Sequence, residues 1–146
     1  MQKKLEFELV PDGCWGYNLR AILSKAQWDY VRNDAKERAG NKCSACGRAV
    51  KRLEGHEKWE YDVEKGIVKL VDVVSLCSEC HKTVHIGRTQ LVGDFDRACK
   101  HYQKVNDCSY AQMREDLGKA NQLHQKRNTV SEWVLDLSWL ERFIKD

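Results

Sequence analysis

The N-terminal part of the chain shows two spacings of apolar side chains. Over residues 5–9 apolar and acidic residues alternate, which is the period of a half-buried strand, and the Pro and Gly of residues 11–13 supply turn chemistry after it. A strand of about five residues is therefore predicted. Further on, Leu19, Ile22 and Leu23 have helical spacing, which predicts a short helix with all three side chains turned inward.

A longer helix is predicted over residues 25–39. Ser24 and Gln27 have the spacing of a capping box, in which each side chain bonds the backbone N–H of the other residue. Gly40 can adopt the left-handed conformation that ends a helix. Three apolar residues keep helical spacing and should form the buried face: Trp28, Val31 and Ala35.

The middle of the chain predicts a β-hairpin followed by a helix. Residues 53–62 are the first candidate strand, residues 64–66 contain the Gly of a turn, and the Val-rich residues 67–74 are the second strand. A helix is expected to follow within residues 76–85. The expected order of elements is β-β-α.

The C-terminal part is predicted to be mainly helical. Asp94 can cap a helix that runs toward Val105, and a second helix is expected over residues 109–126. Residues 132–137 resemble a strand, and residues 138–143 a terminal helical turn. We expect this strand to pair with the N-terminal strand at residues 5–9.

The length and composition indicate one folded domain over residues 1–146, and the predicted elements make it α+β, with the β-β-α core at 40–88 between an N-terminal strand and helix at 1–39 and a helical part at 89–146. Apolar residues make up 42% and charged residues 32% of the chain, and there is one Pro, which is typical of a folded protein. Neither a long apolar run nor a signal peptide is visible, so a cytoplasmic location is expected. The net charge of +3 does not identify a partner.

Four of the seven cysteines lie in two C-x-x-C pairs. Two such pairs supply four thiolates to one tetrahedral zinc ion, and Gly47 permits the tight turn after the first pair. This pattern fits a reducing compartment better than a disulfide framework does. The predicted zinc ligands are Cys43, Cys46, Cys77 and Cys80. The other cysteines are expected to be small, partly buried apolar residues: Cys14, Cys99 and Cys108.

Two histidines after the second cysteine pair predict a second metal site. His81 and His85 are four residues apart, so on a helix their imidazoles lie on one face and can converge on another ion. In the alternative, one of them packs against the zinc site or replaces one of its ligands. Two further histidines, His101 and His124, are expected on helix surfaces.

Residues 40–88 resemble the HNH endonuclease family, whose ββα-metal core is built on a zinc-ribbon or treble-clef scaffold. In that family a C-x-x-C pair precedes a strand that ends in two adjacent catalytic positions. An Asn then lies shortly before a segment of the form Leu-Cys-x-x-Cys-His, which a last His follows. Residues 76–81 have this form, and His85 is the last His. The flanking segments are similar to those of bacterial and phage proteins of this type.

The resemblance implies a role for individual residues. His56 falls on the first of the paired positions and would bind a catalytic ion together with His81 and His85. Glu57 falls on the second, where the family has the His that acts as general base. Asp72 lies near the position of the family's Asn. Glu57 and Asp72 are both departures from the family pattern.

The chemistry that the resemblance implies is hydrolysis of a phosphodiester. A divalent ion (Mg, Mn, Zn or Ni) would offset charge on the phosphate and on the leaving 3′ oxygen, while Glu57 takes a proton from the attacking water or binds the ion itself. Arg88 is a candidate contact to the phosphate, and Trp59 could stack on a base. A surface position for Arg88 and packing within the hairpin for Trp59 remain open alternatives.

The sequence and the resemblance are compatible with three functions. The first is a metal-dependent nuclease that acts on DNA, or less readily on RNA. The second is a degenerate scaffold that binds nucleic acid or a protein partner without cutting, for example a phage-borne inhibitor of a host defence protein. The third is a structural zinc adaptor whose helical C-terminal half makes the contact.

Overall fold

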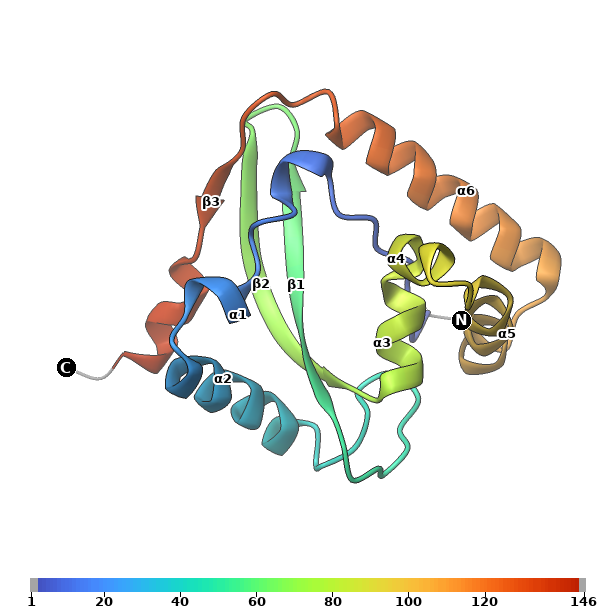
Figure 1. Ribbon diagram of the computed structural model, residues 1–146, viewed down its shortest axis with the longest axis horizontal. Helices are drawn as coiled ribbons and strands as arrows, with labels where there is room; N and C mark the ends of the chain where they lie inside the picture. The colour runs from blue at the N-terminus through green and yellow to red at the C-terminus, as the bar shows by residue number, and fades with distance from the viewer. Residues whose placement is uncertain (1–2, 145–146) are drawn as a thin grey trace.

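The computed structural model describes residues 3–144 and has the predicted α+β architecture (Figure 1). At its centre stands a three-stranded sheet of order β1-β2-β3, formed by Glu54–Asp62, Ile67–Leu76 and Val134–Asp136. Helices α1 (Leu19–Ile22) and α2 (Lys25–Arg38) lie on one side of the sheet, and the other side has α3 (Ser78–Val84), α4 (Ile86–Leu91), α5 (Phe95–Asn106) and α6 (Tyr110–Arg127) (Figure 1). Within residues 3–144 every helix is too short or too polar to cross a membrane.

The predicted hairpin and its following helix are confirmed. β1 and β2 pair antiparallel over their full length, and Gly66 in the turn has a positive φ of 67°. A register shift between Lys58 and Trp59 marks a β-bulge. Helix α3, Ser78–Val84, follows β2 directly, with Cys77 as its N-cap. The start of this helix is therefore held in a fixed position relative to the end of the hairpin.

The predicted helix at residues 25–39 is confirmed as α2, Lys25–Arg38. Its N-terminus has both hydrogen bonds of the capping box between Ser24 and Gln27, and Gly40 beyond its end has a φ of 67°. The predicted apolar face is buried against the sheet, where it packs with Leu70 and Val73 of β2. The residues of that face are Trp28, Val31 and Ala35.

The short helix α1, Leu19–Ile22, is formed as predicted, but only part of its predicted apolar face is inside. Leu19 is fully buried and Leu23 packs against the same cluster. Ile22 is 41% exposed, so the prediction that it points inward was wrong. Because α1 is a single turn anchored through Leu19, its far end extends past the surface that Leu19 contacts.

The predicted strand at residues 5–9 is wrong. These residues run alongside α3 without joining the sheet, and the Glu8 backbone N–H donates to the Val84 carbonyl at 2.9 Å. Leu5 and Phe7 are nevertheless buried, and Phe7 stacks on Tyr102 of α5 with 4.0 Å between ring centroids. The alternating pattern correctly predicted that Leu5 and Phe7 are buried. It could not predict which elements they pack against.

The predicted pairing of the C-terminal strand with residues 5–9 is wrong for the same reason. β3 instead pairs parallel with β2, with Val134 opposite Ile67. A three-residue strand has too little sequence to specify its neighbour, and the edge of β2 offers it unpaired backbone groups.

The C-terminal helices occur where they were predicted and complete the larger of the buried clusters. Tyr102 of α5 is fully buried, and its hydroxyl donates to Asp116 of α6 at 2.7 Å. This cluster joins the N-terminal segment, the cysteine loop, α3, α5 and α6. The remaining elements are η1 (Asp12–Cys14), α4 (Ile86–Leu91), α5 (Phe95–Asn106), α6 (Tyr110–Arg127) and η2 (Ser138–Phe143).

The packing of α2 on β1 predicts the effect of adding one methyl group to the hairpin. A Cβ at Gly55 would lie 2.9 Å from Cβ of Arg32 and 3.0 Å from the Trp28 ring. We expect Gly55→Ala to lower the free energy of unfolding by about 1–3 kcal/mol, because α2 must move away from the sheet. Urea denaturation followed by circular dichroism measures this change.

Gly118→Ala is the matched control, since a Cβ at this position of α6 meets no atom within 4 Å. It should leave stability unchanged or raise it by up to about 1 kcal/mol through helix propensity. A Gly55→Ala protein as stable as the native chain would contradict the close contact between α2 and β1.

Candidate metal centres

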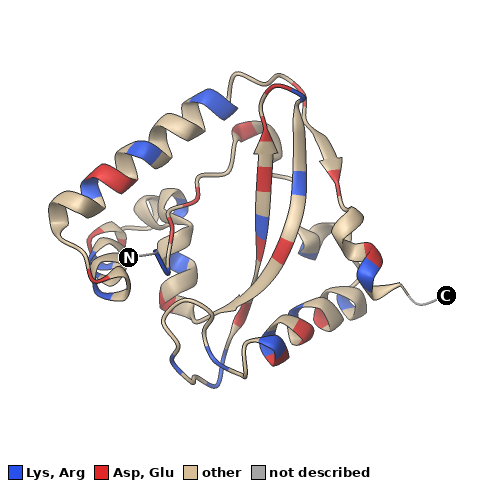
Figure 2. Cartoon of the chain, turned by 180° about the vertical axis from the view of Figure 1, so that it is seen from behind, with Lys and Arg blue, Asp and Glu red and all other residues tan. Residues whose placement is uncertain are grey.

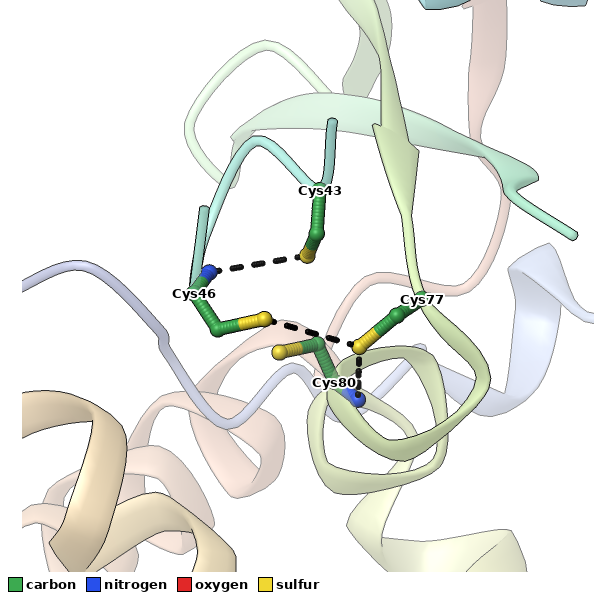
Figure 3. A group of neighbouring side chains, drawn as sticks. All are labelled: Cys43, Cys46, Cys77 and Cys80. Carbon is green, nitrogen blue, oxygen red and sulfur yellow. Dashed lines mark hydrogen bonds between the residues drawn. The ribbon is translucent and has the colours of Figure 1, made fainter. Parts of the chain in front are cut away.

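Four cysteine sulfurs converge where the loop before β1 meets the start of α3 (Figure 3). Their Sγ atoms all lie within 4.8 Å of one another, and those of Cys46 and Cys77 are 3.7 Å apart. Two sulfurs bound at about 2.3 Å to one tetrahedral zinc are about 3.8 Å apart, so this spacing suits the ion. The four-cysteine cluster, Cys43, Cys46, Cys77 and Cys80, can therefore hold zinc as the sequence predicted.

The backbone around the four-cysteine cluster has the turns that a thiolate site requires. The N–H groups of Cys46 and Cys80 point at the sulfurs of Cys43 and Cys77, at 3.5 and 3.4 Å. Gly47 has a φ of 78° and its N–H bonds the Cys43 carbonyl, which closes the loop. The N–H groups of Cys46 and Cys80 stabilise the thiolate form of the sulfurs that they face, and the thiolate is the form that binds a cation.

The thiols of the four-cysteine cluster differ in how readily they ionise. A hydrogen bond from the Cys80 thiol lowers the pKa of Cys43 to about 4, with backbone N–H groups adding to the effect against burial. Arg48 donates to the Cys77 sulfur at 3.6 Å. The hydrogen bond to Cys43 and burial raise the pKa of the Cys80 thiol, and burial raises that of Cys77, so Cys43 is the thiol of these three that ionises most readily.

His101 was predicted to be a plain helix-surface residue, and this was wrong. Its Nε2 lies 3.2 Å from the sulfur of Cys80, and the side chain is partly buried. α5 therefore packs against the four-cysteine cluster through a polar contact as well as apolar ones. A single His on a helix has no pattern that could reveal this partner, because the two residues meet only in the folded chain.

A second group of possible ligands lies between β1 and α3. One ring nitrogen from each of His56, His81 and His85 lies within 4.8 Å of the others. The three ring centroids are 4.9 to 5.2 Å apart, so the imidazoles surround one small space. We call these three residues the histidine cluster.

The alternation of side chains along β1 explains how His56 reaches α3. Glu54, His56 and Lys58 are two residues apart and precede the bulge, so all three project from one face of the strand. On that face Glu54 accepts a hydrogen bond from His81 Nδ1 at 2.9 Å. Glu8 accepts from both His56 Nε2 and Lys58 Nζ, each at 3.0 Å.

Burial keeps the helix histidines neutral, as metal ligands must be. It lowers the pKa of His85 to about 3, and the neighbouring His56 and His81 lower it further. Burial also lowers the pKa of His81, although the carboxylate of Glu54 opposes the effect. Neutral imidazoles offer a lone pair at neutral pH, so no proton has to leave before an ion binds.

Neither Glu57 nor Asp72 belongs to the histidine cluster, although the charge of Glu57 is close enough to raise the pKa of His81. Glu57 follows His56 on β1 and so points to the opposite face, where its carboxylate accepts from the Leu19 N–H at 2.9 Å. The Asp72 side chain lies beside α2, 3.5 Å from Arg38. The predicted catalytic roles of Glu57 and Asp72 stay predictions, and the geometry of the histidine cluster does not require either.

The two predicted substrate contacts lie in different surroundings. Trp59 is partly buried and packs against the apolar clusters on the α2 side of the sheet, away from the histidine cluster. Arg88 is exposed in α4, one turn beyond His85, and its positive charge is close enough to lower the pKa of that histidine. Of the two, only Arg88 is placed near the histidine cluster.

A hollow of about 260 Å³ opens between the N-terminal segment and the cysteine loop. Its apolar lining includes Val74 and Leu76 of β2, and three lysines border it: Lys3, Lys4 and Lys58. Lys58 also bonds Glu8, so this hollow adjoins the residues around His56. Elsewhere positive and negative side chains are mixed, as along α2 and α6 (Figure 2).

Comparisons of the chain with protein-family models, with curated proteins and with solved structures found no match. A functional proposal therefore depends on the geometry of the two clusters.

Sequence reasoning missed three residues around these clusters: Glu8, Glu54 and His101. Glu54 and His56 do stand two apart on a predicted strand, which is a signal that they share a face. Glu8 gave no such signal, because its segment reaches the site from a distant part of the chain.

From the geometry of the four-cysteine cluster we predict that the loss of one thiolate prevents stable zinc binding. We expect Cys80→Ser to lose the zinc, about one ion per chain, because an oxygen ligand replaces a buried sulfur. The loss of a structural metal should cost more than about 4 kcal/mol of stability. Metal analysis after dialysis, with thermal unfolding, measures both effects.

Cys108→Ser provides the control, since Cys108 is a partly buried cysteine outside the cluster. It should keep the zinc content and nearly the native melting temperature. A Cys80→Ser protein with an unchanged melting curve would rule out a structural zinc at this position.

Proposed function

We propose that the chain is a metal-dependent nuclease of the HNH type that hydrolyses phosphodiester bonds, in DNA more readily than in RNA. The observation that carries the proposal is the histidine cluster, in which one strand and one helix of a ββα unit converge three imidazoles. The same helix begins with two of the four cysteines. A structural zinc next to a separate catalytic ion is the treble-clef arrangement of that family.

In this proposal His56, His81 and His85 would hold a second divalent ion. When bound, such an ion polarises a phosphoryl oxygen and offsets charge on the leaving 3′ oxygen. Three neutral imidazoles favour Zn, Ni or Mn, while Mg with several waters is also compatible. The chain's own contribution is to keep the three rings neutral and facing one another.

Positive side chains near the histidine cluster fit an anionic substrate. Arg88 follows His85 on the exposed side of α4, where it can contact a phosphate. Lysines border the neighbouring hollow, whose apolar lining could accept a base.

One observation favours a second candidate function, a module that binds nucleic acid or a protein partner without cutting. Glu57 occupies the position of the family's general base, yet its carboxylate lies on the far face of β1 and bonds α1. An HNH scaffold without a base would retain the fold and the ligands but lose the chemistry, unless a bound ion itself lowered the pKa of the attacking water, which is the role that the nuclease proposal would give to the ion.

The decisive experiment is a cleavage assay on plasmid and single-stranded DNA with Mg, Mn, Ni or Zn. We expect cutting that requires a metal, and His81→Ala should lower its rate by more than about 100-fold, because one ligand of the ion is gone. His124→Ala is the matched control, since His124 lies on α6 outside the histidine cluster. It should cut at the native rate.

Zinc content and circular dichroism of His81→Ala should match those of the native chain. A loss of cleavage can then be attributed to the missing histidine and not to unfolding. If native protein with a full complement of zinc cuts neither substrate with any of the four ions, the binding module becomes the better description.

Glu57 can be tested in the same assay. We expect Glu57→Gln to keep its cleavage rate within a few-fold of the native rate, because the amide oxygen can still accept from the Leu19 N–H and the side chain faces away from the histidine cluster. A rate more than about 100-fold lower, in a protein of native stability, would instead establish Glu57 as the base that its sequence position predicts.

A further inference from the structure

The N-terminal segment reaches the histidine cluster through one carboxylate. Oε2 of Glu8 accepts hydrogen bonds from His56 Nε2 and from Lys58 Nζ, both at 3.0 Å. His56 is 2% exposed, and its other ring nitrogen, Nδ1, is buried without a hydrogen-bond partner among the described residues. A buried polar atom of this kind is costly unless something binds it.

These contacts fix which ring nitrogen of His56 carries the proton. A carboxylate only accepts, so in the neutral imidazole, the form that can bind a metal ion, the hydrogen bond to Glu8 places the proton on Nε2 and leaves the lone pair on Nδ1. His81 has the opposite arrangement, because its Nδ1 donates to Glu54 and its Nε2 is left with the lone pair. The two histidines would thus bind one ion through different nitrogens.

We propose that Glu8, held in place by Lys58, is the positioning residue that directs Nδ1 of His56 at the second metal ion. This inference rests on the second ion of the proposed function. Carboxylates that accept the outer N–H of a metal-bound His set its tautomer and orientation, and removing them typically weakens metal binding about 10–100-fold. No residue of the 40–88 core supplies this carboxylate to His56, so the N-terminal segment completes the site.

The backbone around Glu8 supports a positioning role over direct ligation. Its N–H donates to the Val84 carbonyl at 2.9 Å, in the residue that precedes His85. Both side-chain hydrogen bonds of Glu8 use the same oxygen, Oε2, which faces His56 and Lys58. Glu8 therefore links β1 to the end of α3 and acts on the ion through His56.

The first test measures metal affinity. Protein with zinc in the four-cysteine cluster is titrated with Co²⁺, and the weak visible absorption of a nitrogen and oxygen site is followed. We expect Glu8→Gln to weaken Co²⁺ binding about 10–100-fold. Glu6→Gln, an exposed acidic neighbour in the same segment, should bind Co²⁺ like the native chain. Equal affinities of Glu8→Gln and native protein would overturn the proposal.

Two further variants separate positioning from general loss of stability. Lys58→Met removes the second partner of Glu8 and should weaken Co²⁺ binding by a smaller factor than Glu8→Gln does. Glu8→Asp keeps the charge and should recover part of the affinity that Glu8→Gln loses. If all three variants bind Co²⁺ in proportion to their melting temperatures alone, Glu8 is structural only and the proposal fails.

The second test reads the tautomers directly. Long-range ¹H–¹⁵N spectra of ¹⁵N-labelled protein should show His56 protonated on Nε2 and His81 protonated on Nδ1. In Glu8→Gln, His56 should show a mixture of both tautomers, because a neutral amide can either accept or donate. A His56 proton on Nδ1 in the native chain would overturn the proposal.

Neither measurement depends on cleavage, so the two proposals fail separately. A chain that binds Co²⁺ at the histidines with the expected tautomers, yet cuts nothing, supports the role of Glu8 and refutes the nuclease. A chain that cuts while Glu8→Gln binds Co²⁺ as the native protein does supports the nuclease and refutes the role of Glu8.

Discussion

The convergence of four cysteine sulfurs at the start of α3 is the constraint on which the rest of the structure depends. One hairpin and a helix of seven residues bury too little apolar area to fix their own relative geometry. The four-cysteine cluster joins the loop before β1 to the first turn of α3, and so sets the direction in which that helix leaves the sheet. His81 and His85 face β1 because of this direction. The positions of the two histidines therefore depend on how the four cysteines hold the start of α3.

Contacts from outside the 40–88 core reinforce the same arrangement. His101 of α5 contacts the sulfur of Cys80, and the N-terminal segment bonds the last turn of α3 at Val84. The largest apolar cluster then joins α3 to α5, α6 and residues 5–9. The flanking segments are thus packed directly on α3, the helix that carries Cys80 and His81.

The parts that could be predicted from the sequence are those whose signal is local. The capping box at Ser24, the turn at Gly66 and the two C-x-x-C pairs each specify structure within a few residues, and each was found where predicted. The partner of residues 5–9 and that of β3 could not be predicted, because alternation and strand propensity report burial without naming the surface that provides it. His101 was misjudged for the same reason.

The position of Glu57 shows that a match to a sequence motif does not determine where a side chain points. The resemblance places it beside His56 in sequence, but neighbours on a strand point to opposite faces, and the bulge that could re-aim a side chain comes only after Lys58. The face shared with His56 instead belongs to Glu54 and Lys58. The acidic groups nearest the histidines are consequently Glu54 and Glu8, each engaged with a ring nitrogen. In this chain the carboxylates of Glu8 and Glu54 therefore lie in position to orient the rings of the histidines, whereas Glu57 holds α1 to the hairpin.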